Sequence, residues 1–193
     1  MVNMNNAIDL EKSTRERILA ESIHVFGRLG YRKSSMESLA AAADLSKQGL
    51  YLHFSSKHEL FQASLRYYLD QGLGLVRAHL EQPGQPLSAR LLTAMEVWFG
   101  RHKDTFASGA LDVAVAGLRI ANEDGEQYQA MYRHEIARAI AAAGRESAVF
   151  ASDIAQVLFV CGLSWKEPGL SREEFVARMA LCIKVCLREE KKK

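Results

Sequence analysis

The chain has 193 residues, of which 48% are hydrophobic and 25% are charged, a composition that suits one or two packed domains and excludes a disordered chain. No apolar run approaches the ~18 residues that span a bilayer, and residues 1–30 lack a signal pattern, so we expect a cytoplasmic protein. The formal net charge is +2, and residues 1–60 carry eight Lys or Arg against seven Asp or Glu, so bulk charge gives little support to nucleic-acid binding.

The first predicted helix begins at Ser13. Residues 1–12 lack a clear periodicity and are expected to form a flexible N-terminal arm. Ser13 and Glu16 have the spacing of a capping box, in which each side chain bonds to a free backbone N–H at the start of a helix. Gly30 supplies the left-handed residue that commonly ends one. The apolar face of this helix holds Leu19, Ile23 and Phe26.

Two short helices are predicted next, at residues 36–43 and 47–54. Ser35 and Ser46 immediately precede them, and serine is favoured at the N-cap position. The residues between the helices, 44–46, can form a tight turn. The sequence therefore predicts three helices in the N-terminal part of the chain.

A longer helix is predicted from the capping box of Ser56 and Glu59 to about Leu80. Residues 81–86 hold two of the three prolines and a glycine, which is the clearest break in composition. We therefore place the domain boundary there. The expected parts are the arm at 1–12, a three-helix domain at 13–60 with a connecting helix to about 80, and a C-terminal domain at 83–193.

The pattern beyond this boundary is helical to the end of the chain. Helical segments are expected at 87–103, 104–121, 125–143, 148–164 and 171–190. No run of residues alternates in the manner of a strand. The predicted fold class is therefore all-α, with about nine helices that form an N-terminal three-helix head and a C-terminal helical bundle.

Residues 35–54 have the layout of a helix-turn-helix, whose second helix enters the major groove of DNA. The segments Leu39-Ala40, Leu45-Ser46, Gly49–Phe54 and Ser56–Leu60, with the first-helix pattern from Ile18 to Tyr31, resemble the DNA-binding signature of the TetR family. The match covers residues 14–62. It implies a TetR-like fold and a sequence-specific regulator of transcription, most typically a ligand-responsive repressor that binds a palindromic operator in double-stranded DNA. Asp44 departs from the glycine usual in this turn, but aspartate tolerates a positive φ better than most residues, so we expect the turn to form.

The resemblance also assigns DNA contacts by position. Phosphate contacts are implied for Ser35, Tyr51, His53 and Lys57, with Arg32 and Lys33 nearby. Base contacts are implied for Lys47, Gln48 and Gly49, beside Ser46, because Lys donates to guanine, Gln pairs with adenine and Gly admits the backbone closely. Other roles stay open: Tyr51 and His53 also suit packing, and Lys57 suits a solvated cap.

A homodimer is expected because one helix-turn-helix contacts few base pairs, whereas two-fold dimers read half-sites ~34–36 Å apart. The last two predicted helices carry apolar stripes at helical spacing and are the predicted interface. The family resemblance implies a four-helix bundle there. The two stripes hold Val157, Leu158, Cys161 and Leu163, and Phe175, Met179, Ile183 and Cys186.

The resemblance further implies a small-molecule effector inside the C-terminal helices, which releases DNA by preferring the non-binding arrangement. Candidate contacts are aromatic or polar groups on apolar helices: Trp98, His102, Phe106, Tyr128, Met131 and Trp165, with Phe99, His134 and Phe159 as further candidates. Ordinary core packing is the alternative for each aromatic residue. A surface or hydrogen-bonded position is the alternative for each histidine.

Two rival interpretations remain open. An enzyme is disfavoured because His134-Glu135 lacks the second histidine of a zinc-protease helix, position 138 being Arg138, and we expect no catalytic, metal or cofactor site. A helical DNA-binding dimer without an effector, with an architectural or partner-binding role, would share the same head. Cys182 and Cys186 lie one turn apart and could bind a metal or sense oxidants if exposed, but buried apolar thiols fit better.

Overall fold

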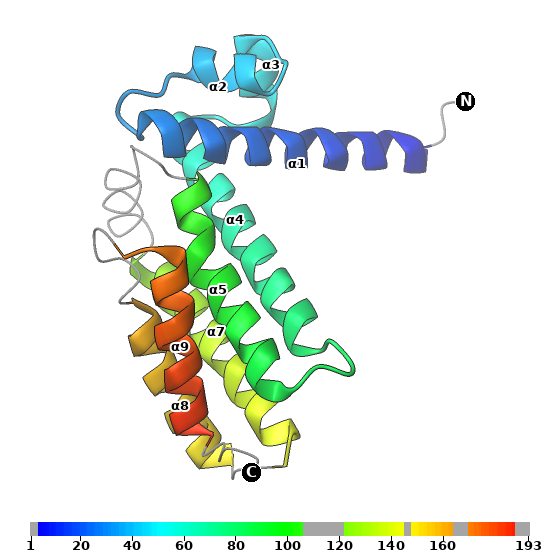
Figure 1. Ribbon diagram of the computed structural model, residues 1–193. Helices are drawn as coiled ribbons and strands as arrows, with labels where there is room; N and C mark the ends of the chain where they lie inside the picture. The colour runs from blue at the N-terminus through cyan, green and yellow to red at the C-terminus, as the bar shows by residue number, and fades with distance from the viewer. Residues whose placement is uncertain (1–3, 106–121, 145–147, 164–169, 188–193) are drawn as a thin grey trace. The chain divides into compact units, whose positions relative to one another are not determined.

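The computed structural model describes residues 4–105, 122–144, 148–163 and 170–187 (Figure 1). Within these ranges the chain forms helices joined by turns and no strand, so the predicted all-α class is confirmed. The helices are α1 (Met4–Leu29), α2 (Met36–Ala42), α3 (Lys47–His53), α4 (Lys57–Leu80), α5 (Leu87–Thr105), α7 (Asn122–Ala142), α8 (Ala148–Leu163) and α9 (Arg172–Cys186). None of the described helices is long and apolar enough to cross a bilayer.

The start of α1 differs from the sequence prediction. The helix begins at Met4 and not at Ser13, so the expected arm at residues 1–12 is wrong for residues 4–12, whose backbone is helical. Ala, Leu, Glu and Lys in this segment have high helix propensity, and lengthening an existing helix needs no new nucleus. Serine can lie inside a helix, so Ser13 does not force a helix to start there.

The described residues divide into two compact units, and the division falls inside α4, after Asp70. The first unit holds α1, α2, α3 and the start of α4, and we call it the head. The second holds the rest of α4 with most of α5 and α7, and α8 and α9, and we call it the bundle. The proline-containing break at 81–86 is a turn that ends α4 and precedes α5. Of the predicted helix 104–121, only residues 104 and 105 are described, and they belong to α5.

The head has its own hydrophobic core. The ring of Phe26 on α1 meets that of Phe61 on α4 edge-on, with centroids 4.9 Å apart, and Tyr31 packs on Phe61 at 5.0 Å. Leu39 of α2 and Leu50 of α3 are both fully buried in this core. Each of the two short helices is therefore anchored by a leucine, which offsets the weak intrinsic stability of helices this short.

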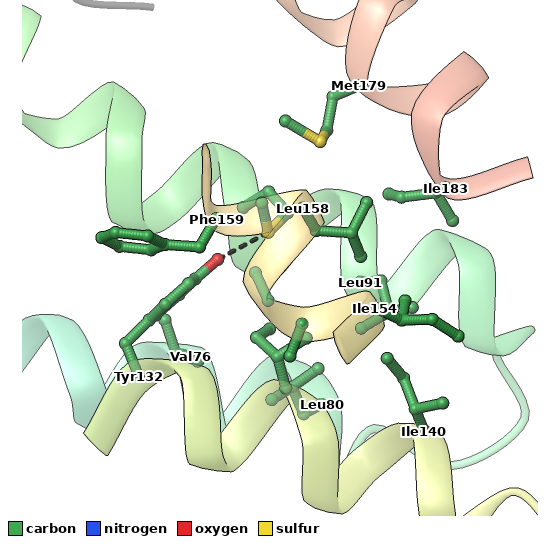
Figure 2. Packing of buried hydrophobic residues seen from close by; sticks show 14 of the residues in the cluster. Val76, Leu80, Leu91, Tyr132, Ile140, Ile154, Leu158, Phe159, Met179 and Ile183 are labelled. Atoms are coloured by element: carbon green, nitrogen blue, oxygen red, sulfur yellow. Dashed lines mark hydrogen bonds between the residues drawn. The ribbon is translucent and has the colours of Figure 1, made fainter. Parts of the chain in front are cut away.

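Aromatic side chains fill the centre of the bundle. Tyr132 of α7 is completely buried, stacks on Trp98 with centroids 4.7 Å apart, and donates its hydroxyl to Met95 Sδ at 2.6 Å. Figure 2 shows this bond as a dashed line among the aliphatic side chains of the core. Burial raises the pKa of Tyr132 well above its ordinary value. Gly162 of α8 is required by the same packing, because a Cβ there would lie 2.1 Å from Phe99 Cε2.

One ion-pair network joins α4 to α7 within the bundle. The carboxylate of Glu135, which is only 8% exposed, accepts a hydrogen bond from Arg77 Nε at 2.7 Å and one from Arg138 Nε at 3.0 Å. Arg138 also donates to Glu81 at 3.0 Å. Because a buried carboxylate is costly unless it is paired, these contacts favour one register of α4 against α7.

Candidate nucleic-acid interface

The turn between α2 and α3 sets the angle of the second helix. Asp44 has a φ of +54°, so it occupies the left-handed region that glycine usually fills. Its amide donates to the Ala41 carbonyl at 3.2 Å, and the amide of Leu45 donates to the Ala40 carbonyl at 2.9 Å. These two bonds are those of a Schellman motif, and Leu45 packs against the head core. The turn therefore forms with aspartate, as the sequence predicted.

Both short helices begin at their predicted serine caps. Ser35 Oγ accepts from the Ser38 amide at 3.1 Å, and the Ser38 hydroxyl completes a capping box with the Ser35 amide. Ser46 Oγ accepts from the Gly49 amide at 3.0 Å. The start of α3 is therefore fixed by its own cap as well as by the preceding turn.

The outward face of α3 carries four side chains. Leu50 is fully buried, whereas Lys47, Gln48, Tyr51 and Leu52 are exposed. Gly49 is half-buried and faces the turn, because a Cβ there would lie 3.3 Å from Ser46 Oγ and 3.9 Å from the Leu45 side chain. Lys47 and Gln48 are therefore exposed, which the predicted contacts with a DNA groove require. Leu52 was not among the residues predicted from the sequence, although it lies one turn after Gln48.

Lys47 has a partner within the head. Its ammonium donates to the carboxylate of Glu37 on α2. This bond lowers the pKa of Glu37 and raises the pKa of Lys47. Both side chains are well exposed, and exposed pairs contribute little, so Lys47 can exchange this partner for acceptors on a base or a phosphate. Sequence reasoning missed Glu37 because ten residues and a turn separate the two charges.

The C-terminal end of α3 is held by α1. Arg15 Nη1 donates to the His53 carbonyl at 3.1 Å, and the guanidinium lies 4.3 Å from the centre of the Phe54 ring. His53 is the last residue of α3 and its side chain is half-buried. The capping bond and the cation–π contact together fix where α3 ends. No local sequence signal indicates this contact, which joins residues 38 positions apart.

Lys57 ties the start of α4 to the segment that follows α1. Its Nζ donates to the carbonyls of Tyr31 at 2.9 Å and of Ser34 at 3.0 Å, and it lies 4.5 Å from the centre of the Tyr31 ring. An ammonium has three donors, so these contacts leave at most one for phosphate. The alternative role of Lys57 as a solvated cap is therefore wrong, because its ammonium makes tertiary contacts within the head. Ser56 Oγ caps α4 as predicted by accepting from the Glu59 amide, whereas the carboxylate of Glu59 accepts from the amide and the hydroxyl of Ser55.

The remaining predicted DNA contacts lie close to these in the fold. Arg32 and Lys33 are exposed in the turn before Ser35, and the exposed fraction of Tyr51 is 45%. The head thus brings three helix starts, the turn at 31–33 and the outward face of α3 into one small unit. Its exposed basic groups and hydroxyls are of the kinds that contact phosphates, and its outward side chains on α3 are of the kinds that contact base edges.

The predicted dimer stripes in the bundle are partly wrong. Leu158, Phe175, Met179 and Ile183 are buried in the bundle's own core. They are therefore unavailable to a second chain. The prediction failed because helical periodicity identifies an apolar stripe without identifying what covers it. Two residues of the predicted stripes, Val157 and Leu163, are exposed. Together with three exposed apolar residues that were not predicted they form what we call the α8–α9 face: Val157, Val160, Leu163, Leu181 and Val185.

A pocket of about 350 Å³ opens between α8 and α9, and its lining includes Leu181 of the α8–α9 face. Its other lining residues are Cys161, Phe175, Arg178, Met179 and Cys182. Burial raises the pKa of the Cys182 and Cys186 thiols, and the neighbouring Cys161 raises the pKa of both further. Protonated thiols are poor nucleophiles, which favours apolar packing over redox sensing. Among the described residues, no three ligating side chains converge on a metal position.

The described residues include the side chains of six of the nine candidate effector contacts. Trp98, Tyr128 and Met131 are partly buried against the bundle core, beside Tyr132. Phe99 and Phe159 are buried core residues, and His134 is exposed. The side chain of His102, and the residues Phe106 and Trp165, lie outside the described part of the chain.

Comparison with known proteins agrees with this geometry. Residues 18–64 match the family model for bacterial regulatory proteins of the tetR family. Over 85 residues the chain is 36% identical to the HTH-type transcriptional activator FasR of Mycolicibacterium smegmatis, a match that covers 44% of this chain and 38% of FasR. The chain spans only about a third of the length of the curated relatives that it matches, with shares of 32%, 34% and 38%.

Solved structures resemble the chain over most of its length. A protein of Mesorhizobium loti assigned to the TetR family gives a TM-score of 0.68 at 16% identity and covers 92% of this chain and 96% of its own. The multidrug binding protein EbrR, solved with imidazole, gives a TM-score of 0.59 at 22% identity and covers 93% of this chain and 98% of its own. At these identities the likeness concerns the fold.

Proposed function

Because the chain belongs to the TetR family of bacterial regulatory proteins, we propose that it is a sequence-specific, DNA-binding regulator of transcription that acts as a homodimer on a palindromic operator. The observation that carries this proposal is the outward face of α3. Lys47 and Gln48 extend from its first turn, while Ser46 caps its start and Arg15 holds its end. A short helix held at both ends can present side chains to base edges in a fixed geometry.

The homodimer rests on the α8–α9 face. Five large apolar residues on two adjacent helices are exposed there, with exposed fractions from 37% to 68%, and a pocket between the helices adjoins Leu181. A second copy of the same face would cover these residues and build a four-helix interface. Two heads would then read half-sites ~34–36 Å apart. We assign the phosphate contacts to Ser35, Tyr51, His53, Arg32 and Lys33, and to the remaining donor of the Lys57 ammonium.

The bundle is proposed to bind a small effector that weakens DNA binding. EbrR, which has a similar fold, is described as a multidrug binding protein. Trp98, Tyr128 and Met131 are the side chains proposed to contact the effector in this chain. Repression is the proposed outcome of operator binding, whereas the relative FasR is described as an activator. In vitro transcription from an operator-containing promoter separates the two by the sign of the change.

The proposal is tested by selecting DNA fragments that the purified full chain retains and by sequencing them. We expect a two-fold symmetric motif with half-sites about one helical turn apart. Leu181→Glu should yield a monomer that binds the motif weakly, whereas Leu75→Glu, which changes an exposed leucine of α4, should remain dimeric. Retention without any enriched motif would favour the alternative role as an architectural, effector-independent DNA-binding dimer.

A further inference from the structure

Leu52 is the most exposed large apolar residue in the described part of the chain. Its exposed fraction is 87%, against 75% for Val149 and 45% for its neighbour Tyr51. The other leucine of α3, Leu50, is fully buried. A single exposed leucine is ordinary on a protein surface, but this one lies on a helix of only seven residues that carries the proposed reading face. Its position is therefore more informative than its exposure alone.

Helix geometry places Leu52 beside Gln48. Residues four apart lie on the same face of a helix, so the two side chains are neighbours and project together from α3. Lys47 and Tyr51 are the corresponding pair next to them and are also exposed. Leu52 immediately precedes His53, whose carbonyl accepts from Arg15. The bond that fixes the end of α3 therefore also fixes the backbone beside Leu52.

The chemistry of leucine restricts what it can contact in DNA. It has no hydrogen-bond donor or acceptor, so it gains no hydrogen bond from a phosphate, a sugar oxygen or a polar base edge. The apolar group that the major groove offers is the C5-methyl of thymine. Glutamine, its neighbour, pairs with adenine through N6 and N7. Both side chains therefore favour A·T base pairs.

We propose that Leu52 is a specificity-determining residue that contacts the C5-methyl of a thymine, in or next to the base pair that Gln48 contacts. This inference rests on the proposed function, since it assumes that α3 enters the major groove. It adds a second recognised feature to each half-site and predicts an A·T-rich core in the operator.

Deoxyuridine tests the contact directly, because it lacks the C5-methyl of thymine and keeps every hydrogen-bonding group. The operator selected by the full chain is remade with each thymine replaced by deoxyuridine in turn. For the parent protein we expect one thymine in each half-site at which replacement lowers affinity about fourfold, the effect of exposing one methyl group. Leu52→Ala should bind the thymine operator more weakly and should not distinguish it from the deoxyuridine operator.

Three controls make the outcome specific. Gln48→Ala should change the preference for adenine and retain the thymine effect, and Leu75→Ala should leave both unchanged. Leu52→Met should retain most of the thymine effect, because it keeps an apolar side chain. Since Leu52 is almost fully exposed, each variant should fold, which circular dichroism checks.

Two results would overturn the inference while leaving the proposed function intact. One is a parent protein that binds its operator equally well with deoxyuridine at every thymine position. The other is a Leu52→Ala variant that retains the thymine effect. A parent protein that selects no DNA motif would instead overturn the proposed function, and with it this inference.

Discussion

The guanidinium of Arg15 lies 4.3 Å from the centre of the Phe54 ring, across a gap of 39 residues in the sequence. Arg15 is on α1, and Phe54 is the C-cap of α3, so one side chain of the first helix packs on the residue at which α3 ends. The same guanidinium donates to the His53 carbonyl. We therefore expect Arg15 to be a positioning residue for DNA recognition, acting through α3 without needing to touch DNA itself.

Arg15→Ala should weaken operator binding and also destabilise the head. An exposed cation–π contact contributes about 0.5–1 kcal/mol, and the capping hydrogen bond a similar amount, so we expect a loss of about 1–2 kcal/mol in unfolding free energy. The stability and the operator affinity of Arg15→Lys should lie between those of Arg15→Ala and the parent, because lysine keeps the charge but cannot stack as a planar group on the ring. Urea unfolding and operator titration measure the two effects.

Arg17→Ala is the matched control for Arg15→Ala. Arg17 is an exposed arginine of the same helix, roughly 200° around it from Arg15, and its removal changes the net charge equally. If Arg15→Ala and Arg17→Ala gave the same small loss of affinity, the effect would be one of bulk charge, and Arg15 would have no positioning role.

Lys57→Met should destabilise the head even without DNA. The methionine keeps an apolar stem but removes the ammonium that donates to the Tyr31 and Ser34 carbonyls, and charged hydrogen bonds contribute about 1.5–3 kcal/mol. We expect a loss of about 2 kcal/mol by urea unfolding. A phosphate contact would in addition lower the salt dependence of DNA binding by about one unit of slope. An unchanged free energy of unfolding would show that the two carbonyl contacts of Lys57 do not stabilise the head.

Asp44→Gly should stabilise the head by about 1 kcal/mol. The substitution removes the cost of the left-handed conformation and takes a negative charge from the C-terminal end of α2. Asp44→Asn is the control, since it removes the charge and keeps a side chain, so it should recover only part of the gain. A lower melting temperature for Asp44→Gly than for the parent would contradict this account of the turn.

Glu135→Gln should destabilise the bundle at neutral pH by about 2 kcal/mol, less than for a fully buried pair because both arginine partners are about half exposed. Burial raises the pKa of Glu135, but hydrogen bonds and charges from Arg77 and Arg138 outweigh it, and the pKa lies below the ordinary 4.5. A depressed folded pKa stabilises the protein above the unfolded value, and this stabilisation is lost as pH falls through the folded pKa.

The difference in unfolding free energy between the parent and Glu135→Gln should therefore be constant near pH 7. It should shrink as the pH falls below about 4.5 toward the pKa of Glu135 in the folded protein. Unfolding by urea at a series of pH values measures it. Glu126→Gln, an exposed residue of the same helix, should show no such difference. A difference that grew with acidity would have the wrong sign for a paired carboxylate.

Local sequence signals were sufficient where one cap or one turn decides the structure. Ser35 and Ser46 predicted the first residues of α2 and α3 because each cap joins a serine side chain to a backbone amide only three residues away. Asp44 was recognised as the turn residue for the same reason. The start of α1 was missed because Ser13 carries a capping pattern, and helix propensity before it outweighs that pattern.

Contacts between segments that are distant in the sequence could not be predicted from the pattern of residues along the chain. Arg15 and Lys57 reach carbonyls 38 and 26 residues away, and neither spacing leaves a periodic signal. On α9, Met179 belongs to the predicted apolar stripe and is buried in the bundle, whereas Leu181, which lies outside that stripe, is exposed. Periodicity locates an apolar stripe but does not tell whether it packs inside its own bundle or faces a second chain, because burial depends on which helices pack against α9.

The central claim is that the outward face of α3 reads DNA, and the affinity of a Lys47→Ala, Gln48→Ala double variant for the selected operator tests it most directly. We predict a loss of tenfold or more at constant salt, since each well-placed base contact contributes about 1–3 kcal/mol, while Arg17→Ala binds nearly as the parent does. Equal affinity of the double variant and the parent, or no binding by the parent even at low ionic strength, would contradict the claim.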